Sequence, residues 1–100
     1  MLWAIVGLFA APSRAQTAAE KLYKDKCEIC HGKDGKGKTD MGKETGVRDF
    51  HSPQVQKETD AQLIEITIKG KKKMPGYQKS ISDDEIKQLV AFIRDLSKKK

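Results

Sequence analysis

Cysteine and histidine are scarce in this chain, which limits the metal sites and disulfides that it can form. Its 100 residues include two cysteines and two histidines. Both cysteines lie in one pentapeptide of the form C-x-x-C-H, which contains Cys27, Cys30 and His31. No second C-x-x-C or H-x-x-x-H pair is present to complete a tetrahedral zinc set. A zinc site that adds His51 to these three residues is disfavoured, because the adjacent Cys30 and His31 would have to share one small ion.

Long apolar runs are also missing. A transmembrane helix needs about 20 consecutive apolar residues, and the longest run here covers residues 2–11. A proline follows this run, and Ser13 and Ala15 place small residues at the positions that a signal peptidase reads. We therefore predict that residues 1–15 are a cleaved signal peptide, although no Lys or Arg precedes the run. Residues 16–100 would form one domain without a membrane span.

Aromatic residues are few, at 6% of the chain, whereas lysine and arginine outnumber the acidic residues and give a formal net charge of +6. Basic charge can serve to bind nucleic acid, but here it is modest and the aromatic residues do not interleave with it. We therefore expect no nucleic-acid partner. Moderate positive charge is better suited to protein partners with acidic surfaces. No internal repeat or second domain is visible.

The C-x-x-C-H pentapeptide is the attachment motif of haem c. Two thiols about one helical turn apart can add to the two vinyl groups on one edge of a porphyrin, and the adjacent histidine then lies under the iron. We therefore predict one covalently bound haem, attached through Cys27 and Cys30, with His31 as an axial ligand. A buried disulfide and a thioredoxin-like redox pair are alternatives with the same spacing. The redox motif, however, follows a strand and opens a helix, whereas this one closes a predicted helix.

Three helix starts share one signal, a Ser or Thr followed three residues later by Glu or Gln, which can form a capping box. The first helix is expected to run through the pentapeptide to Gly32, and the second to Gly70, since glycine commonly ends helices. Apolar residues at helical spacing over residues 86–96 support the third. The three pairs are Thr17 with Glu20, Thr59 with Gln62, and Ser82 with Glu85.

Other segments carry weaker signals. Isoleucines alternate over residues 64–68 as they would in a strand, but the capping pair before them and the glycine after them favour a helix. Ser52 followed by Pro53 predicts a further short turn of helix. Residues 32–46 are rich in Gly and Lys and are expected to form a loop. The sequence therefore predicts an all-α domain with three main helices.

The second axial ligand decides whether the iron can bind anything else. We predict Met74, because Pro75 stiffens the backbone after it and Gly76 permits a turn. A methionine flanked by lysines and a Pro-Gly pair is also a poor core position. Met41 is an alternative that its flexible, glycine-rich surroundings disfavour. His51 is another, and it would give a bis-histidine centre of low potential, whereas methionine paired with histidine raises the potential.

The order and spacing of these motifs resemble class I cytochrome c in its small, single-haem bacterial form. The likeness covers nearly all of residues 16–100, including the C-x-x-C-H-G motif, residues 47–50, Met74 with its following proline, and a final helix that reads LVAFIRDL. It implies the cytochrome c fold, in which the helices wrap around the haem and the first and last helices cross. It also implies that His31 and Met74 are the axial ligands.

The chain departs from this family pattern at two points. Many relatives have a proline soon after the motif, with a nearby carbonyl that orients the histidine ring, but residues 33–38 contain none, so that acceptor is unassigned. Many relatives also have a tryptophan at a haem propionate. Here Arg48 could bind a propionate through two hydrogen bonds. An exposed loop arginine is the alternative interpretation of Arg48.

We predict a soluble periplasmic carrier of single electrons between respiratory proteins, and not an enzyme. If both axial positions are filled, no substrate can reach the iron. Lys71, Lys72 and Lys73 would place positive charge near the haem edge and steer redox partners with acidic docking surfaces, although such a run can also be a solvated surface. We expect a monomer. The alternative function is a haem enzyme, or a gas or ligand sensor, with a labile sixth ligand.

Overall fold

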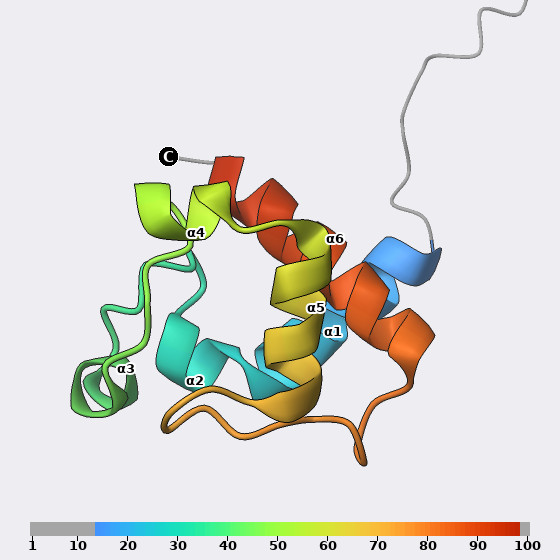
Figure 1. Ribbon diagram of the computed structural model, residues 1–100, viewed down its shortest axis with the longest axis horizontal. Coiled ribbons are helices and arrows are strands. Elements are labelled where there is room, and N and C mark those ends of the chain that lie inside the picture. The colour runs from blue at the N-terminus through green and yellow to red at the C-terminus, as the bar shows by residue number, and fades with distance from the viewer. Residues whose placement is uncertain (1–13, 99–100) are drawn as a thin grey trace, which may run out of the picture.

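The computed structural model describes residues 14–98, which form helices and loops but no strand. An isolated antiparallel bridge between Lys71 and Met74 is the strand-like pairing in these residues. The all-α class predicted from the sequence is confirmed (Figure 1). None of the described helices has both the length and the apolar character needed to cross a membrane. The helices are α1 (Arg14–Lys26), α2 (Glu28–His31), α3 (Asp40–Thr45), α4 (Pro53–Lys57), α5 (Asp60–Lys69) and α6 (Asp83–Lys98).

Most of the predicted signal peptide lies outside the described residues, which begin at Arg14. The predicted cleavage point between Ala15 and Gln16 falls in the first turn of α1. Cleavage at this point therefore stays a prediction.

The core is built around α6, which packs against both α1 and α5. Figure 1 shows these three helices gathered on one side of the molecule, with α3 on the opposite side. Ile86, Leu89 and Val90 of α6 are each at most 2% exposed, at positions that the helical repeat brings to one face. Tyr23 of α1 lies against Phe92 of α6, with ring centroids 5.2 Å apart. The crossing of the first and last helices that the resemblance implies is thus confirmed.

Three of the four predicted helix starts, all except the one at Thr17, are confirmed by their capping contacts. Thr59 and Gln62 form a complete capping box before α5: the Gln62 N–H donates to Thr59 Oγ1 at 3.1 Å, and the Thr59 N–H donates to Gln62 Oε1 at 2.8 Å. Ser82 and Glu85 exchange the same pair of bonds before α6. Ser52 caps α4. The isoleucine-rich segment is therefore a helix, as its cap predicted, and not a strand.

The first helix differs from the prediction at both ends. It begins at Arg14 and contains Thr17, because the alanine-rich residues around Thr17 extend a helix readily. It ends at Lys26, and a turn at Cys27 separates it from α2. Gly32, with a φ of +81°, ends α2 in a conformation that glycine adopts more easily than other residues. The histidine of the pentapeptide therefore lies on a separate one-turn helix.

Residues 32–46 contain the helix α3, where the sequence predicted only a loop. Thr39 starts this helix, since its hydroxyl accepts from the Gly42 N–H at 2.8 Å and also donates to the Cys30 carbonyl at 2.8 Å. Gly42 lets α3 lie directly against α2, because a Cβ atom there would collide with the Cys30 carbonyl oxygen. The prediction missed α3 because it required Glu or Gln three residues after the cap, and glycine occupies that position.

Candidate functional site

Two adjoining hollows lie between the helices and the loops that connect them. The larger one, of about 210 Å³, is called the large cavity here, and the smaller one, of about 40 Å³, the small cavity. The predicted axial ligands are among the residues that line both, although they lie far apart in the sequence. The shared lining residues are Cys27, His31, Thr45, Val47, Lys73 and Met74.

The wall of the large cavity is mostly apolar. Val55 of α4, Leu63 of α5 and Leu89 of α6 line it, and each of these side chains is at most 7% exposed. All three belong to the main hydrophobic core. The cavity therefore interrupts the core itself.

His31, the last residue of α2, is buried in this wall. Its ring stacks on Phe50, with centroids 4.4 Å apart and an interplanar angle of 22°. Within the described part of the chain, its buried Nδ1 atom has no hydrogen-bond partner. Burial lowers the pKa of His31 to about 4. Hydrogen bonding between the ring and the Arg48 backbone raises this pKa, but by less than burial lowers it. The imidazole is therefore neutral at neutral pH, which is the form that binds metal ions.

The two cysteines are free thiols, so the disulfide alternative is not borne out. Burial raises the pKa of Cys27 to about 11. A catalytic redox pair needs a thiol with a lowered pKa, so the thioredoxin-like alternative is not supported either. Across residues 14–98, no three His, Cys, Asp or Glu side chains come together where they could hold a metal ion. The zinc alternative therefore finds no support.

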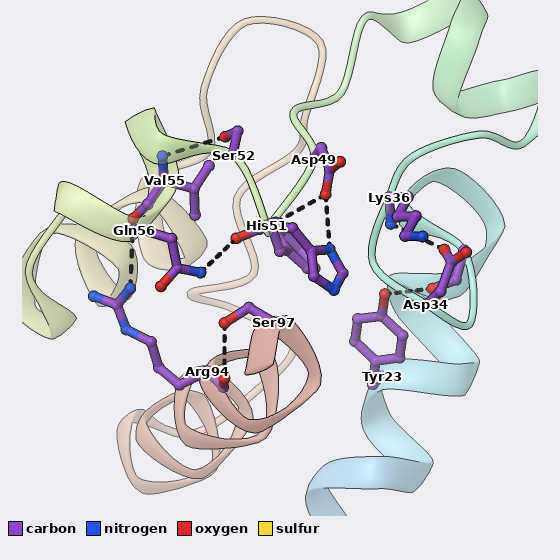
Figure 2. Close-up of polar contacts among 12 residues, drawn as sticks. Tyr23, Asp34, Lys36, Asp49, His51, Ser52, Val55, Gln56, Arg94 and Ser97 are labelled. Atoms are coloured by element: carbon purple, nitrogen blue, oxygen red, sulfur yellow. Dashed lines mark hydrogen bonds and ion pairs between the residues drawn. The ribbon is translucent and has the colours of Figure 1, made fainter. Parts of the chain in front are cut away.

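Met74 lies in the segment between α5 and α6, which folds back on itself. The Lys71 N–H donates to the Met74 carbonyl at 3.1 Å, and the Met74 N–H donates to the Lys71 carbonyl at 3.0 Å. The competing residues lie elsewhere: Met41 is 40% exposed on α3, and His51 Nδ1 is 2.8 Å from the Asp49 carboxylate (Figure 2). Neither lines either cavity. The structure thus brings Met74 to the cavity wall, and not Met41 or His51.

Arg48 lines the large cavity, but its guanidinium is already paired. It donates to the half-buried Glu58 carboxylate. The Glu58 carbonyl accepts in turn from Arg94 of α6, which also donates to Asp60 at 2.9 Å. A contact between Arg48 and a haem propionate stays a prediction. The Arg48 backbone is a candidate acceptor for His31, an assignment that the sequence did not supply.

The three predicted docking lysines are exposed at the rim of the large cavity. Lys72 has a φ of +54°, in the left-handed region that non-glycine residues seldom adopt. Lys73 reaches across to α3, where its Nζ donates to the Glu44 carbonyl at 3.4 Å. Lys71, Lys72 and Lys73 thus place positive charge directly beside Met74.

Tyr77 and Thr67 are buried or partly buried polar residues of the site that were not predicted. Tyr77 lines the small cavity, and its hydroxyl donates to the Lys26 carbonyl at 3.1 Å. Thr67 lines the large cavity at 5% exposure, and its hydroxyl donates to the Leu63 carbonyl at 2.9 Å. The position of Tyr77 directly after M-P-G was the sole signal in the sequence. Its partner lies 51 residues earlier, and spacing does not reveal such a contact.

The residues around the two cavities fit a haem. A haem is a large, flat and mostly apolar group, and the large cavity is walled by core side chains. His31 offers a neutral imidazole with an unpartnered buried nitrogen, and Met74 offers a thioether from another segment. Both free thiols line the small cavity beside them.

Comparison with protein families and curated proteins gives an independent result. Residues 14–93 match the family described as cytochrome C oxidase, cbb3-type, subunit III. The Cbb3-type cytochrome c oxidase subunit FixPc of Rhizobium leguminosarum bv. viciae is 27% identical over 95 residues, which are 95% of this chain and 32% of that protein. Subunit FixP of Rhizobium meliloti (strain 1021) is 29% identical over 96 residues, 92% of this chain and 32% of that protein. The chain thus spans about a third of the length of these relatives.

Solved structures show the same fold. The KustC0563 c-type cytochrome has a TM-score of 0.72 at 34% identity, over 78% of this chain and 95% of that one. A chain of the Kuenenia stuttgartiensis reducing HAO-like protein complex Kustc0457/Kustc0458 has a TM-score of 0.74 at 26% identity, over 90% of this chain and 47% of that one. The resemblance to class I cytochrome c is confirmed, and the chain belongs to the family of c-type cytochromes described as cytochrome C oxidase, cbb3-type, subunit III.

Proposed function

We propose that this chain carries single electrons by means of one haem c, attached to Cys27 and Cys30 and ligated by His31 and Met74. Membership of the family implies haem c and electron transfer. The haem supplies an iron that alternates between the ferric and ferrous states. The observation that supports the ligand set most strongly is that His31 and Met74 line the same two cavities with both thiols beside them.

The chain's own residues would set how the iron behaves. His31 and Met74 together would fill both axial positions and keep substrates and gases away from the metal. A methionine opposite a histidine favours the ferrous state and raises the potential. The apolar wall around Leu63 and Leu89 would exclude water from the site. Such a centre exchanges electrons and little else, so we propose a carrier and not an enzyme.

The cellular setting is proposed on the relatives and on the sequence. The curated relatives are oxidase subunits, which supports a place among respiratory redox proteins. Residues 1–15 are proposed to direct export to the periplasm, where residues 16–100 would act as a monomer. Partners would carry acidic patches that match the basic rim of the large cavity.

Neutralising the three rim lysines together, as Lys71→Gln, Lys72→Gln and Lys73→Gln, is expected to slow electron transfer to an acidic partner about tenfold or more at low salt. Electrostatic steering raises association rates by roughly 10- to 1,000-fold and weakens steeply as ionic strength rises. Stopped-flow rates measured at several salt concentrations check this. The variant should also show a flatter dependence on salt than the unaltered protein.

The matched control changes three exposed lysines that line neither cavity, Lys21, Lys57 and Lys87, to Gln. It removes the same charge, so a general effect of net charge would slow both variants equally. Equal slowing would reject docking at the rim. Rates of the rim variant that match those of the unaltered protein at every salt concentration would reject it as well.

A redox titration followed by optical spectroscopy, with carbon monoxide added to the ferrous protein, tests the proposed function. A carrier with filled axial positions should show a single one-electron transition and should not bind carbon monoxide promptly. Prompt binding would instead favour the alternative function, a haem enzyme or ligand sensor with a labile sixth ligand.

A further inference from the structure

The segment that carries Met74 is a compact unit built on the end of α5. At Gly70, which has a φ of +81°, a Cβ atom would lie 2.6 Å from the Met74 carbonyl oxygen and 2.7 Å from the Gly76 nitrogen. At Gly76, a Cβ atom would lie 2.6 Å from the Ile68 carbonyl oxygen. Both contacts are too close for any other residue type. The segment therefore folds directly onto the last turn of α5.

Backbone hydrogen bonds close this unit. The Tyr77 N–H donates to the Thr67 carbonyl at 2.9 Å, and the Gln78 N–H donates to the Ile68 carbonyl at 3.3 Å. The bridge between Lys71 and Met74 closes the segment on itself, and the bonds from Tyr77 and Gln78 attach it to α5. None of them fixes the segment relative to α1 or α2, which carry the thiols and His31.

The Tyr77 side chain supplies that link. Its hydroxyl donates to the carbonyl of Lys26, which is the last residue of α1 and directly precedes Cys27. The last carbonyls of a helix have no partner within it, so Lys26 is free to accept this bond. Burial raises the pKa of Tyr77, and the neighbouring Cys27 and Cys30 raise it further. Tyr77 thus spans the small cavity from the methionine side to the cysteine side.

A second tie from the segment is weaker. Lys73 Nζ donates to the Glu44 carbonyl at 3.4 Å, near the limit of hydrogen-bond distance, and it does so at an exposed site. Water competes for both groups there. The partly buried Tyr77 bond, at 3.1 Å, is better placed to hold the segment in one position.

We propose that Tyr77 is the positioning residue for the sixth ligand: its bond to the Lys26 carbonyl sets how far the Met74 thioether lies from the iron. This rests on the proposed ligation by His31 and Met74. Without the bond, the Met74 unit can move with α5 away from α1, and the methionine–iron bond becomes easier to displace. Tyr77 does not touch the iron and acts through the backbone.

The test is Tyr77→Phe in the haem-loaded protein, which keeps the ring and removes the hydroxyl. Imidazole is titrated into the ferric protein, where it must displace Met74 to bind, and is followed by absorption. We expect its affinity to rise about tenfold, which corresponds to about 1.4 kcal/mol and is the size of one hydrogen bond. The matched control is Ser97→Ala, which removes a hydroxyl-to-carbonyl bond within α6 and should leave imidazole affinity unchanged.

The outcomes separate this inference from the proposed function. Unchanged imidazole affinity in a haem-containing Tyr77→Phe protein would overturn the role of Tyr77 and leave the carrier intact. An equal rise in the Ser97→Ala control would also overturn it, because general loosening would then be the cause. If Met74→Ala binds imidazole no better than the unaltered protein, Met74 is not the ligand, and both proposals fall.

Discussion

Replacing both Cys27 and Cys30 with alanine is expected to have two effects. The protein purified under denaturing conditions should carry no haem, and the chain kept under native conditions should be largely unfolded. The large cavity, of about 210 Å³, lies in the core. Without the haem, the core side chains that line this cavity would be left facing water. A chain of this size buries little apolar surface for its length, so it depends on the cofactor to complete its core.

Intact-protein mass and far-ultraviolet circular dichroism measure the two effects of this double variant. The single variant Cys30→Ala is the control: it keeps the buried thiol of Cys27, so it should retain haem through one link and keep most of its helical signal. A double variant that lacks haem and still melts cooperatively with full helical content would refute the dependence of the fold on the cofactor.

Replacing Met74 with alanine is expected to change the ferrous protein from one that does not bind carbon monoxide into one that binds it stoichiometrically. The change opens the sixth coordination position and leaves His31 in place. The potential should fall as well, because the thioether that favours ferrous iron is lost. Gas titration followed by absorption, together with a redox titration, measures both effects.

Met41→Ala is the matched control for this variant. It removes the same side chain from an exposed position on α3 that lines neither cavity. It should leave gas binding and potential as they are in the unaltered protein. If Met41→Ala opens the iron and Met74→Ala does not, the assignment of the sixth ligand is wrong.

Local signals in the sequence predicted most of the helices. Capping at Ser52, Thr59 and Ser82 depends on contacts within three residues, which the sequence order shows directly. The prediction failed where the deciding contact was between distant residues or lacked a standard signal. Thr39 caps α3 with a glycine at the third position, and its hydroxyl is also held by α2.

The candidate site was predictable to the extent that its chemistry lies in short motifs. The C-x-x-C-H pentapeptide and the M-P-G segment named the residues that the structure places around the cavities. The supporting contacts were not predictable. The bond from Tyr77 to Lys26, and that from Arg48 to Glu58, join residues whose approach depends on how the helices pack. A pattern in one sequence does not carry that information.

We propose above that one haem is covalently attached to this chain and held between His31 and Met74. The most direct test is the intact mass of the protein purified under denaturing conditions, combined with its visible spectrum when native. We expect a mass that exceeds that of the polypeptide by one haem, and the spectrum of a six-coordinate haem c that does not change on addition of carbon monoxide. A colourless protein with the mass of its polypeptide alone would contradict it.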